Sequence, residues 1–175
     1  SLFKRYAKLT TDRIFSKVSI DFLGPLLVKG HASDRKRNKY YILVVACIST
    51  GAITMYILDN YDTLSAILAL MKLQCSYGKI THILADAGTN LLESNLNLPL
   101  IGEEGKRLFN LISSYRCPPR AQSRNYVESR VKGIKTILNK LMALHNESVR
   151  KEVLELFLEQ VCDIVNCTPY MTDPE

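Results

Sequence analysis

The first half of the chain shows the two-residue alternation of apolar and polar positions that is typical of β-strands. Residues 18–23 alternate in this way, carry Asp21 near their middle and stop at Gly24-Pro25, so they predict a strand that ends there. Two longer apolar runs, residues 40–48 and 52–58, are separated by a short polar turn and predict a hairpin. Their continuous apolarity predicts that at least one of these strands is covered on both faces.

A helix and a further strand are predicted for the middle of the chain. Asp62 or Thr63 can cap a helix whose apolar positions recur every three to four residues and which ends near Tyr77-Gly78. Residues 80–86 are a short apolar run that predicts a buried strand. Asp86 therefore lies at the end of a strand.

The second half of the chain is predicted to be mostly helical. Residues 91–105 are mixed in polarity and indicate a loop, and residues 115–117 are a candidate edge strand. Apolar residues at helical spacing predict three helices, over residues 106–112, 122–144 and 148–166. The order of elements predicts an α/β fold in which helices flank a mixed sheet of five strands.

The composition fits one globular domain. The 175 residues are 47% hydrophobic, which is enough to bury a core. The longest apolar run, residues 40–48, is far shorter than the roughly 20 residues that a transmembrane helix needs, so we expect no membrane span. Lys and Arg number 23 against 17 Asp and Glu, a formal net charge of +6. This balance favours a polyanionic partner, but an ordinary solvated basic surface has the same composition.

The cysteines and histidines give no sign of disulfides or of a structural zinc site. The cysteines are odd in number, form no C-x-x-C pair and mostly lie in apolar runs, so we interpret them as reduced core residues. The histidines lie far apart in the sequence and far from any cysteine pair. These residues are Cys47, Cys75, Cys117, Cys162 and Cys167, and His31, His82 and His145.

Two aspartates lie where a carboxylate is unfavourable without a partner. Asp21 stands between Ile20 and Phe22 inside an apolar strand, and Asp86 ends another apolar strand. A carboxylate in such a place calls for a cation or for hydrogen-bond donors. Hard divalent cations prefer carboxylate oxygens, and a pair of them can stabilise the attacking and leaving oxygens of a phosphoryl transfer. The alternative is that both are ordinary surface carboxylates.

The helix predicted over residues 122–144 presents one charged face. Arg124, Glu128, Lys132 and Lys135 follow one another at steps of four, four and three residues, so they lie on the same side of the helix. They can be solvated ion pairs of an exposed helix. They can equally be a metal-binding carboxylate flanked by cations that contact DNA phosphates. The helix alone leaves both interpretations open.

Five segments in order resemble the catalytic core of retroviral-type integrases, and most closely those of BEL/Pao long-terminal-repeat retrotransposons. Val18-Ser-Ile-Asp-Phe-Leu-Gly-Pro-Leu resembles the strand with the first aspartate, and the hairpin from Lys39 resembles the one that follows it. Ile83-Leu-Ala-Asp-Ala-Gly-Thr-Asn is similar to the motif of the second aspartate. Residues 121–135 resemble the glutamate helix with its two lysines, and Val165-Asn-Cys-Thr-Pro resembles an Asn-x-x-Pro signature.

The resemblance implies an RNase H-like fold and two reactions on DNA: 3′-end processing of the element's cDNA, and strand transfer into target DNA. It implies that two Mg²⁺ or Mn²⁺ ions are held by Asp21, Asp86 and Glu128. It further implies DNA contacts by Lys132 and Lys135 and by the three residues Arg124, Thr89 and Asn90. It assigns residues 1–175 to one core domain.

The same resemblance implies a wider setting. Residues 1–16 are expected to be a leading segment of the core domain. The chain starts without Met or an apolar leader, so we interpret it as an excised fragment. Zinc-binding and C-terminal domains are expected outside it. The expected partners are double-stranded DNA and further copies of the chain, in a homodimer or a higher assembly. The expected location is the nucleus, after a cytoplasmic stage in a virus-like particle or preintegration complex.

The chain departs from the family pattern in several places. Asp86 and Glu128 have 41 residues between them, positions 87 to 127, and the extra length is expected as an insertion in residues 91–105. Ala87, Ala121 and Asn125 replace a common Asn, Pro and Gly, and Asn125 is expected in the loop that approaches the glutamate. The alternative function is a domesticated or inactive integrase-like domain that binds DNA or a protein without catalysis. A nuclease of the RNase H type is a third, less favoured interpretation.

Overall fold

The fold is seen in a computed structural model, which describes residues 13–29, 37–85, 98–114, 122–145 and 149–168. In these ranges four strands form one mixed sheet in the order β3-β2-β1-β4. β1 and β2 are antiparallel, as are β2 and β3, whereas β1 and β4 are parallel. The strands are β1 (Lys17–Lys29), β2 (Arg37–Cys47), β3 (Ile53–Leu58) and β4 (His82–Ala85), and the helices are α2 (Thr63–Tyr77), α3 (Leu98–Ser114), α4 (Gln122–His145) and α5 (Lys151–Cys167).

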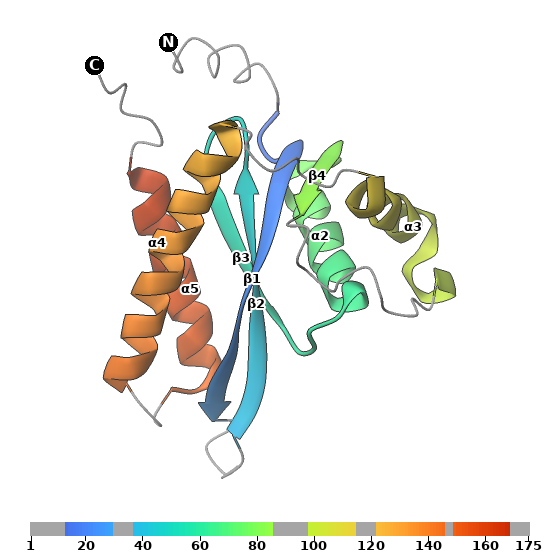
Figure 1. Cartoon of the computed structure of the whole chain (residues 1–175). Coiled ribbons are helices and arrows are strands. Elements are labelled where there is room, and N and C mark those ends of the chain that lie inside the picture. The colour runs from blue at the N-terminus through green and yellow to red at the C-terminus, as the bar shows by residue number, and fades with distance from the viewer. Residues whose placement is uncertain (1–12, 30–36, 86–97, 115–121, 146–148, 169–175) are drawn as a thin grey trace, which may run out of the picture.

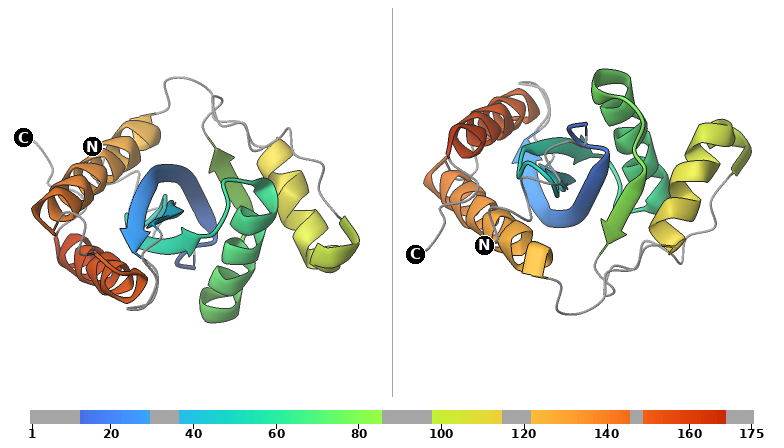
Figure 2. Two further views of the ribbon diagram at one scale, coloured as in Figure 1. Left: turned by 90° about the horizontal axis from the view of Figure 1, so that it is seen from below. Right: turned by 90° about the horizontal axis from the view of Figure 1, so that it is seen from above.

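Helices cover both faces of the sheet. In Figures 1 and 2, α2 and α3 lie on one side of the strands, and α4 and α5 lie on the other. Side chains alternate in β2, so Leu43, Val45 and Cys47 enter the core with α2 and α3, while Ile42 and Val44 enter the core with α4 and α5. The whole of residues 42–47 is buried, which confirms that this strand is covered on both faces.

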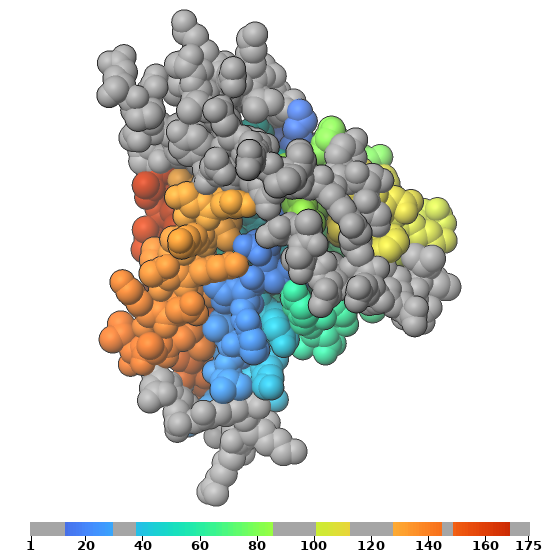
Figure 3. All heavy atoms as spheres, in the orientation of Figure 1, coloured from blue at the N-terminus to red at the C-terminus, as the bar shows by residue number. Residues whose placement is uncertain are grey.

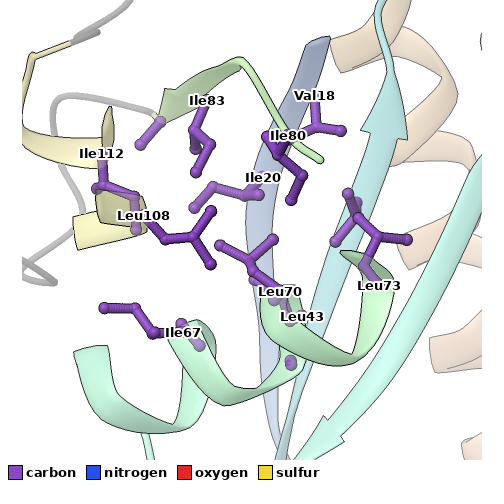
Figure 4. Close-up of a cluster of buried hydrophobic side chains, with 14 of the residues drawn as sticks. Val18, Ile20, Leu43, Ile67, Leu70, Leu73, Ile80, Ile83, Leu108 and Ile112 are labelled. Atoms are coloured by element: carbon purple, nitrogen blue, oxygen red, sulfur yellow. The ribbon is translucent and has the colours of Figure 1, made fainter. Parts of the chain in front are cut away.

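The first of these cores holds the start of β1 in place. Its side chains come from both strands β1 and β4 and from both helices α2 and α3, and Figure 4 shows how they interlock. Most of them are aliphatic and branched, which suits close packing of a helix layer on a sheet. The labelled members are Val18, Ile20, Leu43, Ile67, Leu70, Leu73, Ile80, Ile83, Leu108 and Ile112.

The prediction that the first strand ends at Gly24-Pro25 is wrong, because β1 continues to Lys29. The register against β2 shifts between Leu23 and Leu26, so the two intervening residues form an irregularity inside the strand. Pro25 has no N–H to contribute to the ladder and is tolerated there. Gly24 has a φ of +133°, and a Cβ on it would lie 3.0 Å from the main-chain oxygen of Tyr40. A Gly-Pro pair here bends the strand without ending it.

The predicted helix after the hairpin is confirmed with its caps. The Asp62 carboxylate accepts a hydrogen bond from the main-chain N–H of Ser65 at 2.8 Å, and Gly78 ends α2 with a φ of 97°. The two helices predicted near the C-terminus are also confirmed, as α4 and α5.

The helix predicted over residues 106–112 corresponds to α3, which is longer than predicted. The predicted loop reaches residue 105 and the helix was expected only from residue 106, but α3 begins at Leu98. Gly102 interrupts it with a non-helical φ of 65°, and Pro99 is accommodated in the first turn, where its missing N–H costs no helical hydrogen bond. Ile101, Leu108 and Ile112 are buried. Leu108 and Ile112 lie about one turn apart after the break at Gly102, so the helical spacing is seen in that segment.

Two other expectations need correction or lie outside the described residues. The sheet has four strands in the described part of the chain and not five, and residues 115–117, expected as the fifth strand, fall outside it. The interpretation of the cysteines as core residues is wrong for Cys75 and Cys167, which are exposed, while Cys47 is buried and all four described cysteines are free. Burial raises the pKa of Cys162 to about 11. None of the described helices is long and apolar enough to cross a membrane.

Polar contacts tie the end of α5 to its neighbours. The Asn166 side chain accepts from the N–H of Ile53 at 2.7 Å and donates to the carbonyl of Ile53 at 2.9 Å, so it pairs with the outer edge of β3. Arg130 of α4 donates to the carbonyl oxygens of Val165 and Thr168 at the C-terminus of α5, where a cation is favourable. Asn166 thus ties α5 to the sheet, and Arg130 ties α4 to α5.

The packing of α4 on the sheet can be tested with two isoleucines of the same helix. Ile134 is completely buried, whereas Ile137 is 41% exposed. We expect Ile134→Ala to lower the free energy of unfolding by about 2 to 5 kcal/mol, because it leaves a cavity beneath the helix. Ile137→Ala should stay within about 0.5 kcal/mol of wild type. Denaturant unfolding measures both, and equal losses would show that α4 does not pack as described.

Candidate functional site

Asp21 lies where β1 loses one of its two neighbours. The parallel ladder between β1 and β4 ends with the pair Ile20 and Ala85, and Asp21 is the next residue of β1. From Asp21 to Val28, β1 pairs with β2 alone among the described residues, and Lys29 at its end forms a further bridge with Arg150. Figure 3 shows β1 and β2 reaching the surface between α4 and α2. A side chain on this stretch of β1 can therefore meet solvent or a ligand although the strand belongs to the sheet.

The carboxylate of Asp21 is held by two groups. Its Oδ1 accepts a hydrogen bond from the N–H of Phe22 at 2.8 Å, and its Oδ2 lies 2.9 Å from Nζ of Lys135. Asp21 therefore faces the helix layer of α4 and α5. Its side chain is 36% exposed and that of Lys135 is 34% exposed, so water screens the pair. Such half-exposed ion pairs contribute about 0 to 1 kcal/mol.

Helix α4 brings the charged face predicted from the sequence next to β1. Val131, Ile134 and Leu138 of α4 pack into the core on this side of the sheet. Glu128 lies two helical turns before Lys135, about 10 Å along the axis, and points in nearly the same direction. Glu128 and Lys132 are exposed. The structure thus confirms that one helix face carries these charges, and it shows that the face borders Asp21.

The second aspartate follows the strand that pairs with β1. Asp86 comes directly after Ala85, the last residue of β4, and lies outside the described residues. Thr89, Asn90 and Ala87 lie outside them as well, as do Ala121 and the side chain of Arg124. Asn125 is part of α4, so the expectation that it lies in a loop is wrong.

The carboxylate oxygens of Asp21 are the type of ligand that a hard divalent cation prefers. Asp21 offers carboxylate oxygens that are open enough for water to complete a coordination shell, and a cationic group already lies against one of them. Among the residues that the structure describes, no three His, Cys, Asp or Glu side chains gather at one place. The expected set of three includes Asp86, which is not among them.

A polar cluster that the sequence did not reveal holds the chain just before β4. Gln74 of α2 and both Glu104 and Arg107 of α3 contact one another, and Gln74 and Arg107 also bind the main chain of Ile80. Polar residues at these positions look like ordinary helix surface in the sequence. Only the packing of α3 against α2 and β4 brings them together.

Comparison with known proteins shows the fold. No family model and no curated protein matches the chain. Among solved structures, the catalytic core domain of BIV integrase is similar with a TM-score of 0.50 and 16% sequence identity, over 87% of this chain and 81% of that one. A simian T-cell lymphotropic virus intasome in complex with the PP2A regulatory subunit B56 gamma gives a TM-score of 0.55 and 16% identity, over 94% of this chain and 59% of that one.

A third similar structure is the HTLV-2 integrase catalytic core domain in complex with magnesium, in a dimeric form. It has a TM-score of 0.49 and 16% identity, over 86% of this chain and 84% of that one. The chain therefore has the fold of retroviral integrase catalytic cores. The α/β class and the mixed sheet flanked by helices are confirmed.

The contact between Lys135 and Asp21 can be measured with a double-mutant cycle. We expect Lys135→Gln and Asp21→Asn to be coupled by up to about 1 kcal/mol at low salt, and the coupling to fall as salt screens the pair. Lys132→Gln is the matched control, since it removes a charge one turn away from an exposed position. Denaturant unfolding of the four proteins of each cycle gives the coupling free energy. Equal coupling of Asp21 to both lysines would contradict a specific contact.

Proposed function

We propose that the chain is the catalytic core of a retroviral-type integrase, nearest to those of BEL/Pao retrotransposons, and that it transfers phosphoryl groups of DNA with two divalent metal ions. The observation that carries this proposal is the register of β1 and β4. Ile20 and Ala85 are partners in a parallel ladder, and each is followed in the chain by one of the two aspartates, Asp21 and Asp86. Neighbouring strands lie about 4.8 Å apart.

The register also argues for the direction of the second carboxylate. Side chains of partner residues in a parallel ladder point to the same face of the sheet, and Asp21 faces α4. If β4 keeps its direction for one more residue, Asp86 joins Asp21 on the face that borders Glu128. Three carboxylates from β1, β4 and α4 then surround one space, which is the donor set that hard cations prefer.

Mg²⁺ or Mn²⁺ is the proposed cofactor, with two ions per site. Asp21 would contact both ions, Asp86 would complete one site and Glu128 the other. When bound, the pair supplies charge stabilisation for the attacking and the leaving oxygen of an in-line displacement. In end processing the attacking group is water, and in strand transfer it is the new 3′-hydroxyl. In each case the bond from phosphorus to the leaving 3′-oxygen breaks.

The cations of α4 are the proposed contacts for the DNA end. Lys132 is exposed and Lys135 is half-buried on the helix face that borders Asp21. Ammonium groups on such a face hold phosphates without reading the sequence of the bases. We propose that Arg124 extends this face, and that Thr89 and Asn90 contact the target strand.

A homodimer or a higher assembly on double-stranded DNA is the proposed functional form. β3 is an edge strand, and a groove runs along it between α2 and α5. Leu68 of α2 lines this groove and is exposed, and α5 carries the exposed apolar side chains of Leu156 and Ile164. A second copy would bury these side chains. The further proposals are zinc-binding and C-terminal domains outside this core domain, and action in the nucleus after a cytoplasmic particle stage.

Catalysis is tested with a branched DNA substrate and Mn²⁺. We expect the purified protein to nick and rejoin such a substrate, and Glu128→Gln to lower the rate more than about 100-fold, because losing a metal ligand removes several kcal/mol of transition-state stabilisation. Glu103→Gln, which neutralises an exposed carboxylate of α3, is the control and should react like wild type. Rates are measured by gel electrophoresis of labelled DNA.

An inactive wild-type protein that behaves like Glu128→Gln would contradict the proposal. Calorimetry with Mn²⁺ then identifies the alternative. A folded protein that binds DNA but no metal is the integrase-like binding domain without catalysis that the sequence left open.

A further inference from the structure

We infer that Gln74, Glu104 and Arg107 form a clamp that positions Asp86 for metal binding, a role that rests on the proposed function. The inference starts from the shortness of β4. This strand has four residues and pairs with β1 alone among the described residues. At its start, the N–H groups of Thr81 and His82 both donate to the carbonyl of Ser16, at 2.7 and 3.2 Å. So short a strand needs further support to hold the residue that follows it.

The support acts on Ile80, two residues before β4. Its side chain is completely buried, and both of its main-chain polar groups are bound by side chains of other elements. The N–H of Ile80 donates to Oε1 of Gln74 at 2.9 Å, and its carbonyl accepts from Nη1 of Arg107 at 2.7 Å. Buried main-chain groups without partners are unfavourable, so these two side chains determine where Ile80 can lie.

The clamp is closed by contacts among its own members. Glu104 Oε1 accepts from Nε of Arg107 at 2.7 Å and from Nε2 of Gln74 at 3.1 Å, and Nη2 of Arg107 also donates to Gln74. The hydrogen bond from Arg107 is the main cause that holds the pKa of Glu104 below its usual value. Charge-assisted bonds within such a network are shorter and stronger than neutral ones, and the planar guanidinium fixes their directions.

The clamp links the elements on either side of Asp86. Gln74 belongs to the last turn of α2, Ile80 leads into β4, and Arg107 belongs to α3, which follows Asp86 in the chain. In the chain, Asp86 thus stands between Ile80 and Arg107, two residues that the guanidinium group of Arg107 joins directly. Metal ligands must keep their geometry within about half an ångström. Arg107 is therefore a positioning residue: it acts on Asp86 through β4 and does not touch the reacting atoms.

The test compares two neighbouring cations of α3. Arg107→Met keeps an aliphatic side chain but leaves the Ile80 carbonyl without its donor. Lys106→Met is the matched control, because Lys106 pairs with the exposed Glu103 on the outside of the same helix, at 3.2 Å. We expect Arg107→Met to weaken Mn²⁺ binding about tenfold, as loss of supporting groups does at metal sites. Lys106→Met should bind Mn²⁺ like wild type.

Calorimetry on the full chain, at a temperature where denaturant curves show each variant folded, measures the affinities. A purely structural role for Arg107 would lower the unfolding midpoint and leave the Mn²⁺ affinity of the folded protein unchanged. Arg107→Lys keeps one donor and should recover part of the affinity. If Arg107→Met does not fold, Glu104→Gln, a milder change at a half-exposed position, should shift the affinity in the same direction by a smaller factor.

Asp86→Asn distinguishes failure of the proposed metal site from failure of the clamp inference. If wild type and Asp86→Asn bind Mn²⁺ equally, the proposed metal site is wrong and the clamp loses its role with it. If Asp86→Asn loses Mn²⁺ while the clamp variants keep wild-type affinity, the clamp inference alone is overturned. Loss of affinity in Asp86→Asn and in the clamp variants, with Lys106→Met unchanged, supports both.

Discussion

The parallel pairing of β4 with the first four residues of β1 is the contact on which the candidate site depends. It brings the chain back to the sheet after α2, beside β1, and it ends at Ile20, one residue before Asp21. Up to that point β1 is a central strand with neighbours on both sides. Beyond it, one edge of β1 is open among the described residues until Lys29 bridges to Arg150, and Asp21 is the first residue of that open stretch. A carboxylate can therefore stand on a rigid strand and still be reached.

The ion pair between Lys135 and Asp21 links this strand to α4. A long lysine side chain can lie beside a carboxylate without burying either group, and both remain about one third exposed. Half-exposed ion pairs contribute little to stability, so this pair orients α4 far less than the buried contacts of Ile134 and Leu138 do. Its value for the proposed function is different. It shows that the ammonium group of Lys135, two helical turns after Glu128 on α4, lies against Asp21.

Local signals in the sequence predicted the elements, but contacts between distant segments were not predictable from it. The caps of α2 act within their own helix, so residue types in the sequence predicted Gly78 as the end and either Asp62 or Thr63 as the start. The course of β1 past Gly24-Pro25 was missed because a bulge depends on the partner strand. The helical spacing on α4 predicted a charged face, but spacing cannot say which strand that face meets.

The clamp around Ile80 was the least predictable feature. Three elements must pack before Arg107 and Gln74 can meet the main chain of Ile80, and no local pattern of polar residues signals that meeting. The resemblance to integrase cores rests on short motifs, and the fold agrees with it independently of sequence identity. The assignment of Asp21, Asp86 and Glu128 as ligands goes one step beyond the fold.

Anomalous scattering from crystals soaked in Mn²⁺ tests that step most directly. The account predicts two manganese peaks about 4 Å apart, both within bonding distance of Asp21, one beside Asp86 and the other beside Glu128. Crystals with no manganese at Asp21, and with Lys135 still against its carboxylate, would contradict the account.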